Sequence, residues 1–200
     1  MGKDFYEKTE LGKKYFDIAN DTLGIDIQNI IFNGPDEELR LTKHTQPAIF
    51  IVSTIISELL IKKGFKPDGV AGHSLGEYSA LVAAQGIDFK TGLELVKIRS
   101  ESMAKAGEDN PGTMAAIIGM DLERVTTLAQ EISTNQIVVA ANHNTENQIV
   151  ISGNIKAVQN FTDIAKEHGA RMAIPLNVSG AFHSPLMQPA REELADKLDS

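Results

Sequence analysis

The 200-residue sequence predicts an α/β protein in which a small β-rich subdomain is inserted into a larger core. Three observations predict this fold. A G-x-S-x-G pentapeptide lies between a short apolar run and a helical segment, as in a sharp strand-to-helix turn. Residues 113–176 alternate between strand and helix periodicity in the order β-α-β-β-α-β. The composition, 42% hydrophobic and 23% charged, is ordinary for a globular chain.

The chain before the pentapeptide is predicted to be mainly helical. Leu11, Tyr15, Phe16 and Ile18 recur at near-helical spacing, and a second apolar helix pattern follows Gly24. Thr45 is expected to cap a long helix that has a proline near its start and ends near residue 63. Residues 69–71 are predicted to form a short buried strand that leads into the pentapeptide, and residues 89–105 a further helix.

The second half of the chain has a different rhythm. Strands are expected at 113–118, 137–141, 148–152 and 171–176, with helices at 121–132 and 155–168. This order is typical of a ferredoxin-like subdomain. We therefore predict a ferredoxin-like subdomain over residues 113–176. Residues 1–112 and 177–200 would form an α/β-hydrolase-like core with a parallel sheet, and a last helix would begin after Ser184.

The pentapeptide is Gly72-His73-Ser74-Leu75-Gly76. Its context predicts a nucleophile elbow, a tight turn that exposes the serine hydroxyl. We expect both glycines to be needed because the backbone passes close to itself there. The following helix would offer backbone N–H groups to a developing oxyanion. The motif by itself also fits a glycine-rich loop without chemistry.

An activated serine needs a base within hydrogen-bonding reach, and the chain has five histidines. His183 is favoured because its small-residue loop leaves a predicted strand and enters a helix. The residues alone leave the other four as alternatives. We expect a structural role for His73 and surface or capping roles for His44 and His168. His143 is expected in a loop at residues 142–144 between two strands.

Arg99 is the other notable side chain, on the predicted helix after the pentapeptide. Most arginines on helices are solvated, so one interpretation is that Arg99 is an ordinary solvent-exposed helix residue. The other is a two-point fork for a carboxylate, which suits the guanidinium group. The residues alone do not choose between them.

Composition excludes several classes of function. The formal net charge of −8 disfavours nucleic-acid binding, and the lack of cysteine excludes thiolate catalysis and disulfides. The first residues lack the apolar core of a signal peptide. Polar side chains interrupt the apolar run 48–61, which we expect to be too polar to span a bilayer. These features predict a cytoplasmic protein with no metal centre and no membrane partner.

Four stretches in order resemble malonyl-CoA:acyl-carrier-protein transacylases and the related acyltransferase domains of fatty-acid and polyketide synthases. The resemblance runs along essentially the whole chain. It is carried by the segments Gly72–Ala80 (GHSLGEYSA), Thr45–Ala48 (TQPA), Gly112–Ile117 (GTMAAI) and Gly180–Met187 (GAFHSPLM).

The resemblance implies a two-step acyl transfer. Ser74 would take the malonyl group from malonyl-CoA, with His183 as the base, and pass it to the phosphopantetheine thiol of an acyl carrier protein. Arg99 would bind the free malonyl carboxylate, and Leu75 would supply one oxyanion N–H. The remaining residues that the resemblance implies line the substrate: Phe182, Asn142 and Gln46. The resemblance implies that this chain carries no cofactor. It also implies a place in fatty-acid or polyketide biosynthesis.

The chain also departs from the family pattern at its ends. It starts just after the position of the family's first strand and G-Q-G-x-Q loop, and it stops before the family's last strands. We expect a fragment or a shortened product, with exposed apolar faces and low activity because one oxyanion donor is missing. Two alternatives are a serine esterase or thioesterase and an inactive module that docks a carrier protein.

Overall fold

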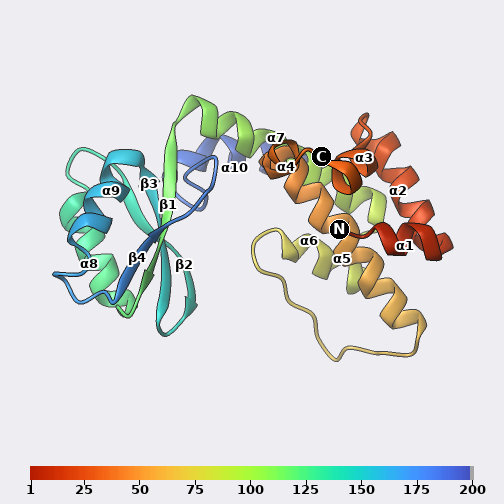
Figure 1. Cartoon of the computed structure of the whole chain (residues 1–200), viewed down its shortest axis with the longest axis horizontal. Coiled ribbons are helices and arrows are strands. Elements are labelled where there is room, and N and C mark those ends of the chain that lie inside the picture. Colours follow the sequence, from red (N-terminus) through yellow and green to blue (C-terminus); the bar gives the residue numbers. More distant parts are fainter. Residues whose placement is uncertain (199–200) are drawn as a thin grey trace. The chain divides into compact units, whose positions relative to one another are not determined.

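The computed structural model describes residues 1–198, which form two compact units (Figure 1). Unit 1 is Met1–Glu101, and unit 2 begins at Ser102. The division falls inside one long helix, α7 (Phe89–Asp109), which extends four residues past its predicted end. The assignment of residues 1–112 and 177–200 to one core stays a prediction.

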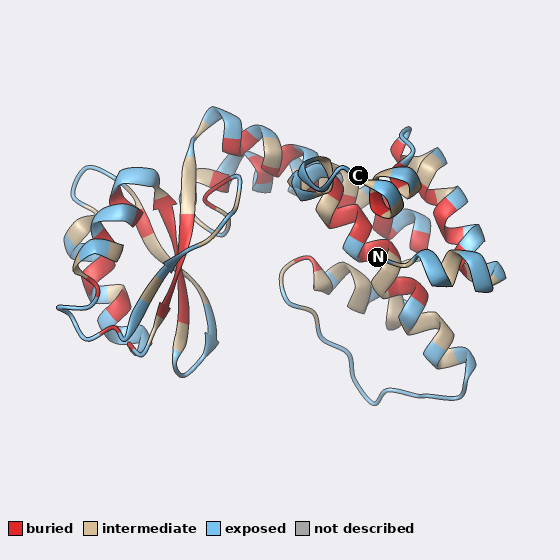
Figure 2. Ribbon diagram, in the orientation of Figure 1, coloured by how far each residue is buried: buried red, intermediate tan, exposed pale blue. Residues whose placement is uncertain are grey.

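Unit 1 consists of helices around one apolar core. They are α1 (Lys3–Lys8), α2 (Glu10–Leu23), α3 (Ile27–Asn33), α4 (Asp36–Arg40), α5 (Thr42–Lys62), α6 (Gly76–Ala83) and the first part of α7. The fully buried side chains include Phe16, Phe50 and Leu93. The Phe89 ring at the start of α7 stacks on Tyr15 of α2 and Phe50 of α5, with centroids 4.0 and 5.6 Å apart. These contacts join α2, α5 and the first part of α7 around one apolar core. Figure 2 shows the buried residues of these helices in red.

Helix α5 begins four residues before the predicted start, so the expectation that Thr45 caps it is wrong. The Leu41 carbonyl already accepts the N–H groups of His44 and Thr45, and the Thr45 hydroxyl bonds back to Leu39. By length and composition α5 could also cross a membrane, contrary to the expectation from its interrupted apolar run. It packs against α2 and α6 in the core instead, as the buried Phe50 shows.

The segment between α5 and α6 differs from the sequence prediction. Residues 69–71 carry no strand, and Val70 is 41% exposed in a long loop seen in Figures 1 and 2. A strand needs a hydrogen-bonded neighbour, and no described segment pairs with this one. Among the described residues the sheet is the antiparallel one of unit 2. An open apolar groove of about 550 Å³, which includes the exposed Phe65, lies between this loop and α5.

Unit 2 contains the predicted β-α-β-β-α-β order. Its elements are β1 (Gly112–Ile118), α8 (Leu122–Ile132), β2 (Val138–Thr145), β3 (Gln148–Asn154), α9 (Ile155–Ile164) and β4 (Met172–Pro175). The antiparallel sheet has the order β2-β3-β1-β4, in which the two outer strands are not neighbours in sequence. Helices α8 and α9 cover one face, where Ile117, Ile149 and Phe161 are fully buried (Figure 1). The ferredoxin-like prediction is confirmed in this topology.

The opposite face of this sheet carries a smaller apolar cluster. Met114, Ala116 and Val150 are buried there, and Phe182 packs against them. After β4 the chain forms a loop, a short 3-10 helix, η1 (Pro185–Met187), and α10 (Gln188–Leu198). Phe182 also packs against Met187 in a second cluster. Phe182 therefore anchors the loop that holds His183 to both apolar clusters.

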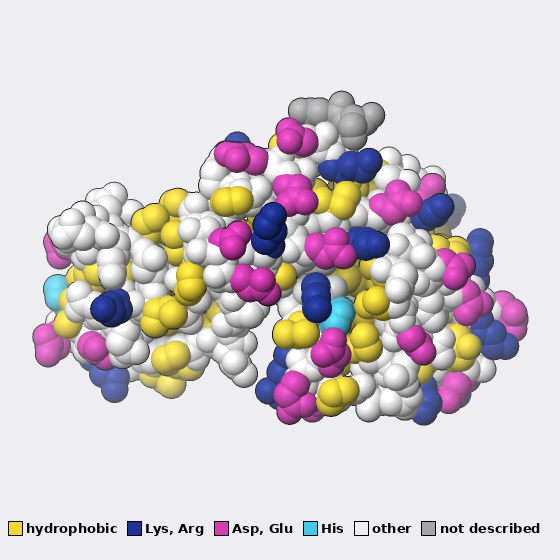
Figure 3. Space-filling model, turned by 90° about the horizontal axis from the view of Figure 1, so that it is seen from above, with side chains coloured by type: hydrophobic (Ala, Val, Ile, Leu, Met, Phe, Trp, Pro, Cys, Tyr) yellow, Lys and Arg dark blue, Asp and Glu magenta, His cyan; other side chains and the backbone are white. Residues whose placement is uncertain are grey.

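The net charge of −8 is not concentrated on the face that Figure 3 shows. Basic and acidic side chains are interspersed there, with apolar side chains between them. An acidic partner would therefore need a local group of basic residues.

Candidate active site

Ser74 lies in a tight turn directly before α6. Its backbone is left-handed, with φ of 52°, which is uncommon for a residue other than glycine. The turn is closed by a 2.9 Å bond from the Gly76 N–H to the His73 carbonyl. Leu75 is the N-cap of α6, so its N–H belongs to the helix end that offers unpaired donors. The nucleophile-elbow geometry is thus present although the strand before it is not.

The two glycines of the pentapeptide have different roles. A Cβ atom on Gly72 would lie 1.9 Å from the carbonyl carbon of Gly76, so only glycine fits there. A Cβ atom on Gly76 would meet nothing within 4 Å. The expectation that close backbone approach requires both glycines is therefore confirmed at Gly72 and wrong at Gly76.

Arg99 contacts the predicted nucleophile directly. It projects from α7, and its Nη2 donates to Ser74 Oγ at 2.9 Å. Its Nη1 donates to Gln46 Oε1 on α5. Arg99 is therefore not an ordinary solvated helix residue, because its two terminal nitrogens join the serine turn to a second helix.

The environment of Arg99 is partly apolar. Burial lowers the pKa of its guanidinium, while Tyr78 and Glu77 act in the opposite direction. The guanidinium carbon lies 5.8 Å from the centre of the Tyr78 ring, within the range of a cation–π contact. Burial also raises the pKa of the Tyr78 phenol. An arginine stays charged under such shifts, so a fixed cation lies beside Ser74.

Gln46 is buried, with 6% of its surface exposed. Its Nε2 donates to Thr42 Oγ1 at 2.9 Å, one turn earlier on α5. The sequence analysis named Gln46 as polar lining and did not name Thr42 or Tyr78. The i, i+4 spacing of Thr42 and Gln46 was the available signal, since it places both side chains on one helix face.

His183 belongs to unit 2, in the loop between β4 and η1. It has a φ of 58° and an exposed side chain. The neighbouring Ser184 holds this loop: its hydroxyl donates to the Ala181 carbonyl at 2.6 Å and accepts from the Leu186 N–H at 3.3 Å. The loop position expected for His183 is confirmed.

Asn142 and Phe182 are also in unit 2. The expectation of a loop at residues 142–144 is wrong, because β2 continues to Thr145. Asn142 pairs with Val150 of β3 next to an irregularity in the register, and His143 pairs with Ile149. Pairing with β3 extends the strand past the point where its apolar run ends. Phe182 is half-buried between the two apolar clusters described above.

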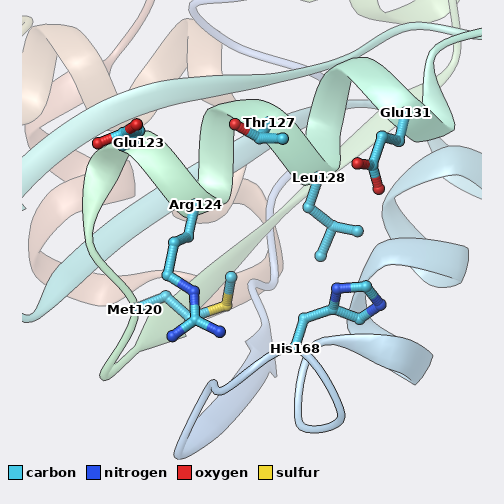
Figure 4. Close-up of a pocket in the computed structure, with 7 residues that line it drawn as sticks. All are labelled: Met120, Glu123, Arg124, Thr127, Leu128, Glu131 and His168. Carbon is cyan, nitrogen blue, oxygen red and sulfur yellow. The ribbon is translucent and has the colours of Figure 1, made fainter.

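The other histidines have separate surroundings. His44 is buried in α5, so the surface role expected for it is wrong. Its Nδ1 lies 3.0 Å from the carbonyl oxygen of Glu38 in the last turn of α4, which fits the capping alternative. His73 is exposed. His168 is also exposed and points into a hollow of about 200 Å³ beside α8, with Arg124 and Glu131 (Figure 4). Among residues 1–198, no three histidine, aspartate or glutamate side chains are grouped as a metal site requires.

A serine in a tight turn at a helix N-terminus, with a partly buried arginine bonded to its hydroxyl, is the kind of site that handles acyl groups. The Acyl transferase domain model matches residues 1–200, and the chain belongs to that family. The malonyl CoA-acyl carrier protein transacylase of Bacillus subtilis (strain 168) is 46% identical over 201 residues, covering 100% of this chain and 63% of the relative.

Solved structures show the same similarity. The malonyl CoA-acyl carrier protein transacylase of Coxiella burnetii aligns with a TM-score of 0.95 and 35% identity, over 100% of this chain and 64% of that one. A type II PKS acyl-carrier protein complex with its malonyl-transacylase aligns with a TM-score of 0.94 and 40% identity, covering 100% and 65%. The α/β acyltransferase fold is therefore confirmed. The chain spans less than two thirds of the length of these relatives.

Proposed function

We propose that this chain transfers a malonyl group from malonyl-CoA, through an ester on Ser74, to the phosphopantetheine thiol of an acyl carrier protein. The observation that carries the proposal is the contact of 2.9 Å between Arg99 Nη2 and Ser74 Oγ. It is supported by relatives named malonyl CoA-acyl carrier protein transacylase and by the structural similarity to a transacylase bound to its carrier protein.

The first half-reaction forms the ester. Ser74 Oγ attacks the thioester carbonyl carbon while His183 accepts the hydroxyl proton. The Leu75 N–H stabilises the oxyanion in this proposal. The C–S bond then breaks, and His183 returns the proton to the leaving thiolate, which departs as free CoA. The carrier thiol attacks the ester in the second half-reaction, with the same proton movements reversed, and Ser74 is regenerated.

Arg99 explains why malonyl is the favoured acyl group. The malonyl carboxylate is separated from the reacting carbonyl by a single methylene, so a guanidinium in contact with the serine hydroxyl can bind it. An unpaired carboxylate in this partly buried site would be unfavourable. An acetyl group lacks that carboxylate and gains nothing from Arg99. Phe182, Asn142 and Gln46 are proposed to line the acyl site.

No cofactor is needed by these steps, since the acid, base and oxyanion donors are protein groups and the phosphopantetheine belongs to the carrier. We place the reaction in fatty-acid or polyketide synthesis in the cytoplasm. The absence of cysteine fits this reducing compartment.

The test is to incubate the protein with malonyl-CoA and measure its intact mass before and after adding a holo acyl carrier protein. We expect one malonyl group on Ser74, none on the Ser74→Ala variant, and its movement to the carrier. Release of malonate without a carrier would indicate a hydrolase. Carrier binding without any loading would indicate a docking module, and either result would overturn the proposal.

A further inference from the structure

The hydrogen bond between Thr42 and Gln46 has no part in the proposed chemical steps, yet it is directly connected to them. Thr42 is the first residue of α5, and Gln46 follows one turn later. Thr42 Oγ1 accepts from Gln46 Nε2 at 2.9 Å, and Gln46 Oε1 accepts from Arg99. Arg99 then donates to Ser74. One continuous chain of hydrogen bonds thus runs from the start of α5 to the nucleophile.

The chemistry of the two groups fixes the direction of this chain. A guanidinium has only donors, so Gln46 can serve Arg99 only through its oxygen. Its amide nitrogen must then face away from Arg99, and in a buried position it needs an acceptor. The Thr42 hydroxyl is that acceptor. Turning the amide over would place two donors, Gln46 Nε2 and Arg99 Nη1, against each other.

We propose that Thr42 is a positioning residue for Arg99, which acts through Gln46 and thereby favours acyl groups that carry a carboxylate. This inference rests on the proposed function. With Thr42 in place, both ends of the amide are held, and Arg99 has a fixed partner on one nitrogen. Its second nitrogen is then directed at the acyl site beside Ser74.

A Thr42→Val variant keeps the shape of the side chain and removes the acceptor. The loss of one such hydrogen bond corresponds to about a threefold to tenfold change in an equilibrium or a rate. We expect the ratio of malonyl to acetyl loading on Ser74 to fall by that factor. Thr42→Ser retains a hydroxyl and should restore the ratio.

Thr54→Val is the matched control on the same helix. Thr54 is 1% exposed, and its hydroxyl donates to the Phe50 carbonyl, away from the Arg99 contacts. It should leave the loading ratio unchanged even if it lowers the melting temperature. Equal ratios for Thr42→Val and the wild type would overturn the inference, as would equal losses of malonyl and acetyl loading.

A double-mutant cycle tests whether Thr42 acts through Gln46. In a Gln46→Ala background no amide is left to position, so adding Thr42→Val should not lower the loading ratio further. Additive effects of the two substitutions would show that Thr42 acts by another route and would overturn the inference.

A spectroscopic measurement separates this inference from the proposed function. The Gln46 side-chain NH₂ protons, observed by ¹⁵N NMR, should exchange with water faster in Thr42→Val than in the wild type or Thr54→Val. Unchanged exchange would overturn the positioning role. If the wild type loads no acyl group but the exchange behaves as expected, the proposed reaction fails while the Thr42–Gln46 contact stands.

Discussion

Ser74 and His183 have the same unusual backbone conformation but are held in different ways. Both are non-glycine residues with positive φ, 52° and 58°. In unit 1 the turn at Ser74 depends on the missing side chain of Gly72, and the serine hydroxyl contacts Arg99. In unit 2 the loop at His183 is held by the hydroxyl of the next residue, Ser184.

The difference shows which substitutions each site should tolerate. The serine turn leaves no space for a side chain at Gly72, so a single methyl group added there should disrupt the turn. The histidine loop is held by two hydrogen bonds of the Ser184 side chain, and losing them should cost only a modest amount of free energy. The only other described non-glycine residue with positive φ is Gln85, which follows the end of α6, where such backbone is common. The other two positive-φ positions are the proposed catalytic residues, Ser74 and His183, and such backbone strain is typical of functional sites.

The largest expected effect is that of His183→Ala. Removing the base should lower the rate of malonyl loading by about 10²- to 10⁴-fold, since general-base catalysis contributes that much. Stopped-flow release of CoA measures this rate. A loading rate within a few-fold of the wild type would remove His183 from the reaction and end its comparison with Ser74.

The next effect separates the two glycines of the elbow. Gly72→Ala should lower the free energy of unfolding by about 3 kcal/mol or more, because its methyl group overlaps the Gly76 backbone. Gly76→Ala is the matched control and should leave stability unchanged or raise it by up to about 1 kcal/mol, since alanine favours a helix start over glycine. Chemical denaturation measures both. Equal losses would contradict the steric account.

Arg99→Lys tests the side-chain part of the comparison. Lysine keeps the charge but lacks the planar fork that contacts Ser74 and Gln46 together. We expect malonyl loading to fall by about tenfold, the equivalent of one charge-assisted hydrogen bond. Steady-state loading at several malonyl-CoA concentrations measures the change. Full activity of the lysine variant would show that charge alone suffices.

Ser184→Ala tests the hydrogen-bonded loop. It removes both bonds that hold the His183 backbone and should lower the loading rate by about threefold to tenfold. Ser133→Ala, whose hydroxyl bonds Val138 elsewhere in unit 2, is the control for a general loss of stability. If the two variants have the same loading rate, the two Ser184 hydrogen bonds have no role in the reaction.

The smallest effect concerns the start of α7, the helix that carries Arg99. Hydrogen bonds from Thr91, first through its backbone N–H at 2.7 Å, hold the pKa of Asp88 below its usual value. The stability from this contact is present above the ordinary aspartate pKa and is lost as pH falls through the lowered one. Thermal melts of Asp88→Asn should therefore be less dependent on pH below about 4. If the melting temperature of Asp88→Asn depends on pH as that of the wild type does, the contact with Thr91 does not stabilise the ionised Asp88.

Sequence patterns predicted unit 2 well because its elements carry local signals. The alternating apolar residues of β1 and β3 and the Asp121 cap of α8, which accepts from the Arg124 N–H at 2.8 Å, are each visible in a short window. The extension of β2 through Asn142 was not visible. It depends on pairing with β3, and the residues there are polar.

Unit 1 was predicted less completely because its site depends on contacts between distant segments. The pentapeptide identified Ser74, and the family resemblance assigned a substrate role to Arg99. The bond between Arg99 and Ser74 joins residues 25 positions apart, and no periodic pattern indicates it. The strand expected at residues 69–71 failed for the same reason, since a strand requires a partner that no local window shows.

The central claim is that Arg99 selects malonyl for the nucleophile Ser74. The most direct measurement is competition: the protein is loaded from an equimolar mixture of malonyl-CoA and acetyl-CoA, and the two esters on Ser74 are counted by mass spectrometry. The wild type should carry mainly malonyl, and Arg99→Ala should shift the ratio toward acetyl by about tenfold or more. The same ratio in both proteins would contradict the account.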